Sequence, residues 1–303
     1  MIKTDKLIVS VCPVGSWVTK EVNPNVPIQP EEIAEEVLRC ENEGASIVHI
    51  HARDKEGNAT TDPKVFAEID NQIRAKGSTI IIQHSLSPGR SPRTATKSDI
   101  SYGPENIIFG QADMGLEALG GSAEMASLDI GVAVHTGATE RVTLWTRNFL
   151  DTIAKTMLAK GIKPEPELFN DGGMVEISEL IAKGLLKKPY WIGFCFGLHR
   201  TSQNRMPYTP KHMMHLVDQL PDDAMFTTCA IGADETPAAV LSILLGGHCR
   251  VGFEDNPYYS RGVKAKSNTQ LVERIVRIGR DIGRKIASPD EARELLGIPP
   301  LKK

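Results

Sequence analysis

Short apolar segments rich in isoleucine, valine and leucine recur along the chain, and each is followed by a longer stretch with helical periodicity. Apolar runs of this length, bounded by Gly, Pro, Asn or Asp, are typical of β-strands. Most of them are continuously apolar, which is the pattern of parallel strands buried on both faces. The sequence predicts eight such strands, at residues 7–15, 46–54, 79–85, 126–136, 163–170, 190–197, 225–232 and 249–255.

Helix start signals lie between these strands. Proline follows Gln29, Asp62, Thr209 and Thr236, and acidic residues stand beside several of these prolines. Proline at the first helical position and acid in the first turn both favour helix initiation. The chain is therefore a repeat of β-α units, with a long helix expected over 267–283 and a short terminal helix from Ser288.

A closed (β/α)8 barrel and an open doubly wound sheet both fit this alternation. The count of eight strands favours the TIM barrel, as do the polar residues at the C-terminal ends of several runs. In a barrel those ends converge on one mouth, where active sites lie. We expect a single α/β barrel domain over residues 1–303 with a short C-terminal helical appendage. Its mouth would gather His49, His51, His84, Ser85, Asn170, Asp171, Glu254 and Asp255.

Two long loop-like stretches, 87–99 and 199–210, follow predicted strands. Long loops on the catalytic face of a barrel serve as lids or substrate walls, and some form oligomer contacts. Because barrels of this size commonly form dimers or tetramers, a homo-oligomer is expected.

The charge balance excludes some classes of partner. With 35 Lys and Arg against 38 Asp and Glu, the formal net charge of -3 gives no basic surface for nucleic acid or an anionic membrane. No apolar stretch approaches the ~20 residues of a spanning helix, and the N-terminal apolar run is too short for a signal sequence. The five scattered cysteines fit reduced, buried thiols. We expect a cytoplasmic protein that acts on small molecules.

The sharpest chemical signal is the His49-Ile50-His51 segment of the second strand. Because side chains alternate along a strand, both imidazoles point to the same face, while Ile50 points to the helix layer. Two neutral imidazoles are half of a site for zinc, copper, iron or nickel, and a third protein ligand would complete a catalytic site with an open position. Two core histidines bonded to neighbouring carbonyl groups are the other interpretation.

The last predicted strand carries Arg250, Gly252 and Glu254 on one face, and barrel closure places it near the first two strands. Charged side chains inside a barrel are costly unless they are paired or bind a metal. Glu254 as a third metal ligand, with Arg250 as a carboxylate anchor, would remove that cost. An Arg–Glu ion pair at the end of the barrel would remove it as well.

Three other positions could take part in chemistry at the mouth. Glu167 interrupts the fifth strand and could act as a general base, although a polar strand end explains it equally. Ser85 closes the third strand and could bond a substrate carboxylate. Trp17 follows the first strand and could wall a substrate pocket or cap the barrel.

These residues stand in longer segments that resemble the β-keto acid cleavage enzyme family, of the 3-keto-5-aminohexanoate cleavage enzyme type. The resemblance runs through almost the whole chain. It is carried by Gly44-Ala45 with residues 49–54 (HIHARD), and by 123–128 (AEMASL), 164–170 (PEPELFN), 252–262 (GFEDNPYYSRG) and 267–272 (SNTQLV).

The resemblance implies a zinc-bearing barrel that takes a β-keto acid and acetyl-CoA and returns acetoacetate and a new acyl-CoA by Claisen and retro-Claisen steps. By motif position, one zinc ion per chain would be bound by His49, His51 and Glu254. The catalytic residues would be Glu167, Asp255 and Arg250.

Substrate binding would fall to Ser85, Trp17 and Ser127. The CoA site is less specified, because Arg200, Arg205 and Arg261 all lie in loops after strands and could meet phosphates or be solvated charges. Arg261 is our candidate for CoA binding.

Three departures from the family pattern bear on the site. Ala123 stands where proline is expected, and Glu165-Pro166-Glu167 stands where Glu-Leu-Glu is expected. Trp17 occupies the position at which the aminohexanoate enzyme has an acid for the amino group of its substrate. An indole cannot pair with a primary ammonium as a carboxylate does, but it can face an apolar chain or a quaternary ammonium. Trp17 therefore predicts an apolar or trimethylammonium-bearing β-keto acid.

Two other functions fit parts of the pattern. A metal-dependent aldolase or lyase of another barrel lineage needs only the paired histidines and would act without acetyl-CoA. A metal-bearing ligand sensor without activity would need the metal ligands alone. The additional polar residues Arg250, Asp255 and Glu167 count against the sensor.

Overall fold

A closed, parallel barrel of eight strands forms the centre of the protein. The computed structural model describes residues 1–86, 107–109, 122–136 and 141–301. In chain order the barrel strands are β2 (Val9–Val11), β3 (Ile47–Ile50), β6 (Ile81–His84), β8 (Met125–Asp129), β11 (Lys163–Leu168), β12 (Tyr190–Phe196), β14 (Ala224–Ala230) and β15 (His248–Val251), and β15 pairs with β2. Each predicted strand overlaps one of them, so the expected TIM barrel is confirmed.

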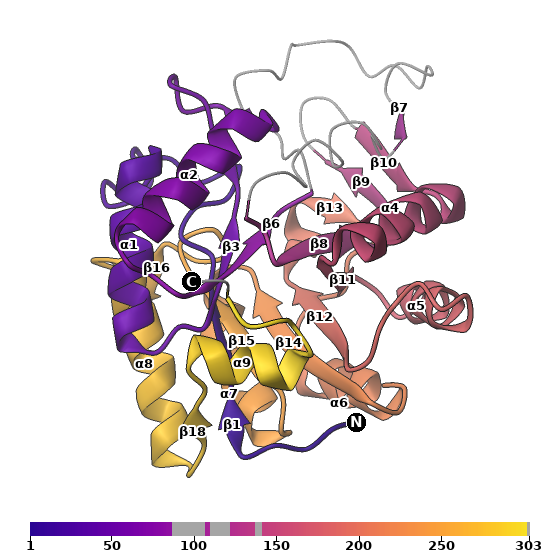
Figure 1. Cartoon of the computed structure of the whole chain (residues 1–303). Coiled ribbons are helices and arrows are strands. Elements are labelled where there is room, and N and C mark those ends of the chain that lie inside the picture. The colour runs from indigo at the N-terminus through magenta and orange to yellow at the C-terminus, as the bar shows by residue number, and fades with distance from the viewer. Residues whose placement is uncertain (87–106, 110–121, 137–140, 302–303) are drawn as a thin grey trace.

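Helices surround the barrel strands (Figure 1). They are α1 (Pro30–Glu43), α2 (Pro63–Ala75), α4 (Arg147–Lys160), α5 (Gly173–Ala182), α6 (Pro210–Asp218), α7 (Glu235–Leu244), α8 (Asn268–Asp281) and α9 (Pro289–Leu296). The predicted start signals are confirmed at α1, α2 and α6, where proline is the first helical residue. The side chains of Asp62 and Thr209 accept hydrogen bonds from the backbone N–H groups of Lys64 and His212, which caps α2 and α6.

The predicted strand over 126–136 is wrong in one respect, because the structure divides it into two strands. β8 ends at Asp129, and Gly131 has a φ of 95°, a left-handed value that glycine adopts without steric cost. The chain turns there and continues as β9 (Gly131–His135). β9 lies outside the barrel in a second sheet, with β13 (Ser202–Gln203), β10 (Arg141–Trp145) and β7 (Ile107–Phe109).

Short strand pairs complete the described structure. β1 (Lys6–Leu7) pairs with β18 (Lys285–Ile286), β4 (Ala52–Arg53) with β5 (Ala59–Thr60), and β16 (Tyr258–Ser260) with β17 (Val263–Lys264). The expected loop 199–210 contains β13 and the end of a 3-10 helix, η3 (Leu198–Arg200). The other expected loop, 87–99, lies outside the described residues.

The terminal helix α9 covers the N-terminal end of the barrel. Its residues Ala292 and Leu296 pack in one buried cluster with inward-facing residues of the barrel, namely Ile8, Ile47, Ile81, Met125, Trp191 and Met225. Arg293 is buried in the same place and donates hydrogen bonds to Glu124 and to the carbonyl oxygen of Thr79. The predicted appendage thus plugs one end of the barrel, and the opposite end, where the strands finish, is left for the site.

Two further observations concern the length of the helices and the state of the cysteines. Within the ranges that the structure describes, no helix is both long and apolar enough to span a membrane. All five cysteines are free and buried, as the sequence predicts.

Candidate metal centre and active site

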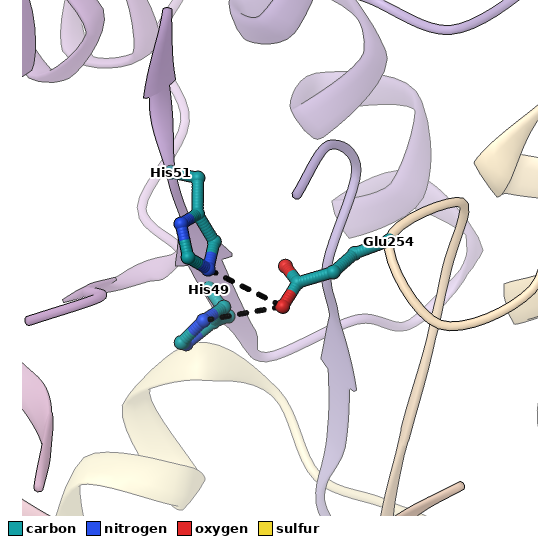
Figure 2. Close-up of side chains that lie close together, drawn as sticks. All are labelled: His49, His51 and Glu254. Atoms are coloured by element: carbon teal, nitrogen blue, oxygen red, sulfur yellow. Dashed lines mark ion pairs between the residues drawn. The ribbon is translucent and has the colours of Figure 1, made fainter. Parts of the chain in front are cut away.

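Three side chains meet at the C-terminal end of the barrel, as Figure 2 shows: His49, His51 and Glu254. The Oε1 atom of Glu254 lies 3.3 Å from Nε2 of His51 and 3.8 Å from Nε2 of His49. One ligand atom from each residue falls within 4.8 Å of the others. The two histidines share a face of β3 and its end because side chains alternate along a strand, as the sequence predicts.

Glu254 reaches this point from a turn and not from a strand. β15 ends at Val251, and the backbone N–H of Glu254 donates to the carbonyl oxygen of Cys12 at 3.2 Å. Gly252 allows this close approach, because a Cβ atom there would lie 2.3 Å from the same oxygen. The predicted grouping of Glu254 with the histidines is therefore found, but a glycine turn beside β2 produces it.

Each histidine is oriented by a hydrogen bond at its other ring nitrogen. Nδ1 of His49 lies 3.0 Å from Oε1 of Gln83, and Nδ1 of His51 lies 3.0 Å from Oγ of Ser16. An amide oxygen can only accept, so Nδ1 of His49 carries the proton and Nε2 presents its lone pair. This tautomer directs Nε2 toward Glu254, as metal-binding histidines require.

The charge state of the three residues also suits a cation. Burial, and next the positive charge of Arg250, lower the pKa of His49 to about 3, so its imidazole is neutral at neutral pH. Burial acts to raise the pKa of Glu254, but Arg250 and the two histidines outweigh it and hold this pKa far below its ordinary range. Oε2 of Glu254 is buried without a hydrogen-bond partner among the described residues. Two imidazole lone pairs and a carboxylate with a free oxygen therefore fit a divalent metal with N and O preference.

Arg250 links Glu254 to the other acidic residues of the mouth. Its Nη2 donates to Oε1 of Glu254 at 2.9 Å, and its Nε and Nη2 form a two-point contact with Asp255 at 2.9 and 2.8 Å. Its Nη1 lies 3.3 Å from Oε1 of Glu167. The Sγ–H of Cys12 adds a hydrogen bond to Oδ2 of Asp255 at 3.2 Å. The three residues predicted as catalytic thus form one buried network beside the metal-type cluster.

Glu167 has a second acidic neighbour, Asp129, on the adjacent strand β8. The two residues are direct partners in the β11–β8 register, and both are buried. Burial, and next the charge of Asp129, raise the pKa of Glu167 well above its ordinary value. Burial and the neighbouring carboxylate therefore favour the protonated form of Glu167 relative to an ordinary exposed glutamate.

Glu165, the other acid of β11, supports the metal-type cluster instead of facing it. Its Oε2 accepts hydrogen bonds from Nε2 of Gln83 at 2.8 Å and from Nε1 of Trp191 at 2.6 Å. A chain of contacts therefore runs from Glu165 through Gln83 to His49. Gln83 and the support role of Glu165 were not predicted from the sequence, although Gln83 is a polar residue inside an apolar strand.

The residues predicted to bind the substrate or CoA differ in how exposed they are. Ser85 is buried directly after β6, Ser127 is buried in the middle of β8, and Oγ of Ser127 accepts a hydrogen bond from the backbone N–H of Leu86. Trp17 lies at the surface, 46% exposed, with its ring 6.3 Å from that of His135. Arg261 is exposed between β16 and β17.

Some residues expected at the mouth point elsewhere. His84 faces the helix layer, where its Nε2 lies 2.9 Å from Oδ1 of Asp70 on α2, so its assignment to the mouth is wrong. Alternation explains this, because Gln83 takes the inward position. Asn170 donates to the carbonyl oxygen of Asn204, and Asp171 is exposed beside His215.

Comparisons with known proteins match nearly the whole chain. The model of the beta-keto acid cleavage enzyme family matches residues 6–298. The 3-keto-5-aminohexanoate cleavage enzyme of Acetoanaerobium sticklandii is 35% identical, over 97% of this chain and 99% of its own length. The 3-oxoadipate:acetyl-CoA acetyltransferase of Cupriavidus necator is 31% identical, over 99% of this chain and 97% of its own.

The fold also has a solved relative. The apo structure of ObcA superposes with a TM-score of 0.71 at 19% identity, over 91% of this chain and 66% of that one. Similarity at this level of identity bears on the fold alone. The family match and the curated relatives go further: the chain belongs to the β-keto acid cleavage enzyme family and is an enzyme of carbon–carbon bond cleavage.

Proposed function

We propose that the protein is a zinc-dependent enzyme that converts a β-keto acid and acetyl-CoA into acetoacetate and a new acyl-CoA. The observation that carries the proposal is the cluster of His49, His51 and Glu254 directly against the network of Arg250, Asp255 and Glu167. The names of the family relatives, a cleavage enzyme and an acetyl-CoA acetyltransferase, support the same chemistry.

Zinc would be held by Nε2 of each histidine and by the carboxylate of Glu254. It would supply a Lewis acid that withdraws charge from the keto and carboxylate oxygens of the substrate, which favours the enolate form. Three protein ligands of this kind leave an open position for substrate, as in catalytic zinc sites.

The protein's own groups would orient the substrate and move protons. Arg250 is fixed by its two-point contact with Asp255, so its guanidinium is positioned before substrate binds. Glu167, whose pKa is raised by burial and by the neighbouring Asp129, would accept a proton from C2 of the β-keto acid and return it later. Burial of the pair keeps this exchange away from bulk water.

The proposed reaction has two stages, and every bond that forms is matched by one that breaks. In the first, C2 of the β-keto acid forms a bond to the acetyl carbonyl carbon and CoA leaves as the thiolate. In the second, the CoA thiolate attacks the original keto carbon, the bond from that carbon to C2 breaks, and C2 regains a proton. The products are a new acyl-CoA and acetoacetate, whose keto carbon comes from acetyl-CoA.

Isotope labelling tests this scheme and separates it from a lyase that acts without acetyl-CoA. Zinc-loaded protein is incubated with acetyl-CoA labelled with carbon-13 at the carbonyl carbon and with a panel of β-keto acids. The proposal predicts label at the keto carbon of acetoacetate and no turnover when acetyl-CoA is omitted. Loss of the β-keto acid without acetyl-CoA, or unlabelled acetoacetate, would contradict it.

A further inference from the structure

Arg205 is a buried cation in the mouth of the barrel to which the proposed reaction gives no task. It follows β13, and the whole residue is 8% exposed. Its Nε and Nη1 atoms are both buried and have no hydrogen-bond partner within the described part of the chain. Leaving buried donors of a charged group unpaired is unfavourable, so a missing acceptor is indicated.

The backbone on both sides of Arg205 is fixed. Asn204 has a φ of 59°, an uncommon left-handed value for a residue other than glycine, and its carbonyl oxygen accepts a hydrogen bond from Nδ2 of Asn170. The N–H of Met206 donates to the carbonyl oxygen of Phe169 at 2.9 Å. The segment that carries Arg205 is therefore held to the end of β11 on both sides of this residue.

Two aromatic rings define how Arg205 can bind a ligand. Its guanidinium carbon lies 3.7 Å from the centroid of the Phe169 ring and 5.9 Å from that of Trp145. Contact with the Phe169 ring occupies one face of the planar guanidinium and leaves the N–H groups at its edge for an acceptor. A planar group with one negative charge, a carboxylate, matches that edge. The phosphates of CoA are more strongly charged and hydrated, and they suit a solvated site better than this enclosed one.

A series of charged residues connects the surroundings of Arg205 with the metal-type cluster. The carboxyl groups of Asp129 and Glu167 act electrostatically on Arg205. Asp129 is the register partner of Glu167, which contacts Arg250, and Arg250 in turn contacts Glu254. No hydrogen bond joins Asp129 and Arg205 in the described ranges, and Oδ1 of Asp129 is buried without a partner. A substrate held at the histidines would extend past Asp129 toward Arg205.

We propose that Arg205 anchors a second carboxylate at the far end of the substrate, so that the enzyme acts on a β-keto dicarboxylic acid. This inference rests on the proposed function, because the metal-type cluster must hold the reacting end. It replaces the apolar or trimethylammonium end group that Trp17 predicts. Trp17 is 46% exposed at the rim, whereas Arg205 is enclosed and would repel a second cation.

A matched pair of substrates tests the proposal. 3-Oxoadipate and 3-oxohexanoate have the same carbon chain and differ only in a terminal carboxylate or methyl group. With zinc-loaded enzyme and saturating acetyl-CoA, we expect kcat/KM for the dicarboxylic acid to be about 100-fold higher, the scale of a charge-assisted hydrogen bond in a buried site. In Arg205→Met, which can still pack against Phe169, this preference should disappear while turnover of 3-oxohexanoate stays within about 3-fold.

Control variants separate recognition from folding. Arg39→Met removes an arginine that is 56% exposed and pairs with Glu36 on α1, and it should leave the preference unchanged. Arg205→Lys keeps the charge but loses the planar edge, and should restore only part of the preference. An equal loss for both acids in Arg205→Met, a raised KM for acetyl-CoA alone, or a wild-type preference for a trimethylammonium-bearing acid would overturn the proposal.

A binding measurement keeps this inference distinct from the proposed function. Calorimetric titration of the zinc-loaded protein with each acid, without acetyl-CoA, should show tighter binding of 3-oxoadipate that Arg205→Met abolishes. If this preference appears but no acetoacetate is formed, the proposed reaction fails and the carboxylate site stands. If acetoacetate is formed and wild type binds both acids equally, the carboxylate site fails alone.

Discussion

Gln83 offers a direct way to perturb the candidate metal centre without touching a ligand. Its Oε1 lies 3.0 Å from Nδ1 of His49, its Nε2 donates to Glu165 at 2.8 Å, and the residue is fully buried. In Gln83→Leu the Nδ1–H of His49 would lose its acceptor, while Glu165 would keep its bond from Trp191. The imidazole could then rotate or change tautomer, which removes the lone pair from the metal position.

The expected loss of zinc affinity follows from two estimates that agree. Removing an outer partner of a metal-binding histidine typically costs about 10- to 100-fold in metal affinity, or about 1.4–2.7 kcal/mol. An unsatisfied buried donor costs about 1–3 kcal/mol. We therefore predict that Gln83→Leu weakens zinc binding by about 10- to 100-fold, with wild-type stoichiometry at high zinc.

The assay is a competition titration of metal-free protein with zinc and a chromophoric chelator. Thr227→Val is a matched control, because Thr227 is also buried inside the barrel and its hydroxyl has no hydrogen-bond partner in the described structure. Melting curves of the metal-free proteins show whether folding alone is affected. Zinc affinity of Gln83→Leu within about twofold of wild type would refute the role of Gln83 in orienting His49.

Two further predictions concern stability. Burial lowers the pKa of His248 from 6.5 to about 3, and its Nδ1 accepts a hydrogen bond from the N–H of Ile8, so the folded state resists protonation there. Between pH 6.5 and 3 the unfolded chain binds more protons than the folded protein, so the contribution of His248 to the unfolding free energy is lost as pH falls through this range. In His248→Gln the unfolding free energy should therefore change less steeply with pH on the acid side. An unchanged slope would contradict this. Arg293→Met should lower the unfolding free energy, measured by denaturant titration, by about 3–5 kcal/mol, because it breaks a buried ion pair with Glu124. Asp290→Asn changes another partner of Arg293 that is 82% exposed, and should have little effect in the same titration. Equal losses in both variants would contradict this prediction.

The barrel could be predicted from the sequence because each strand is an apolar run between turn residues. The prediction did not place the break after Asp129, because 126–136 is apolar on both sides of Gly131 and only tertiary pairing shows that β9 joins another sheet. The terminal helix was expected, but its role as a plug depends on which barrel residues it meets.

The metal-type cluster could be predicted because alternation fixes the shared face of His49 and His51, and barrel closure brings the last strand near them. Gln83 could not be assigned in the same way, because it is adjacent to another polar residue, His84, and the sequence does not show which of the two faces inward. Arg205 was one of three loop arginines without distinguishing context. Its burial depends on Phe169 and Trp145, which come from other strands and their ends.

The metal content of the purified protein and of two ligand variants tests directly whether His49, His51 and Glu254 bind zinc. Wild type, His49→Ala and Glu254→Ala are dialysed against limiting zinc and measured by elemental analysis, with circular dichroism to verify folding. We expect about one zinc ion per wild-type chain and a loss of bound zinc in both variants, because each removes one of three ligands. Absence of zinc from wild type after loading, or full zinc occupancy in both folded variants, would contradict it.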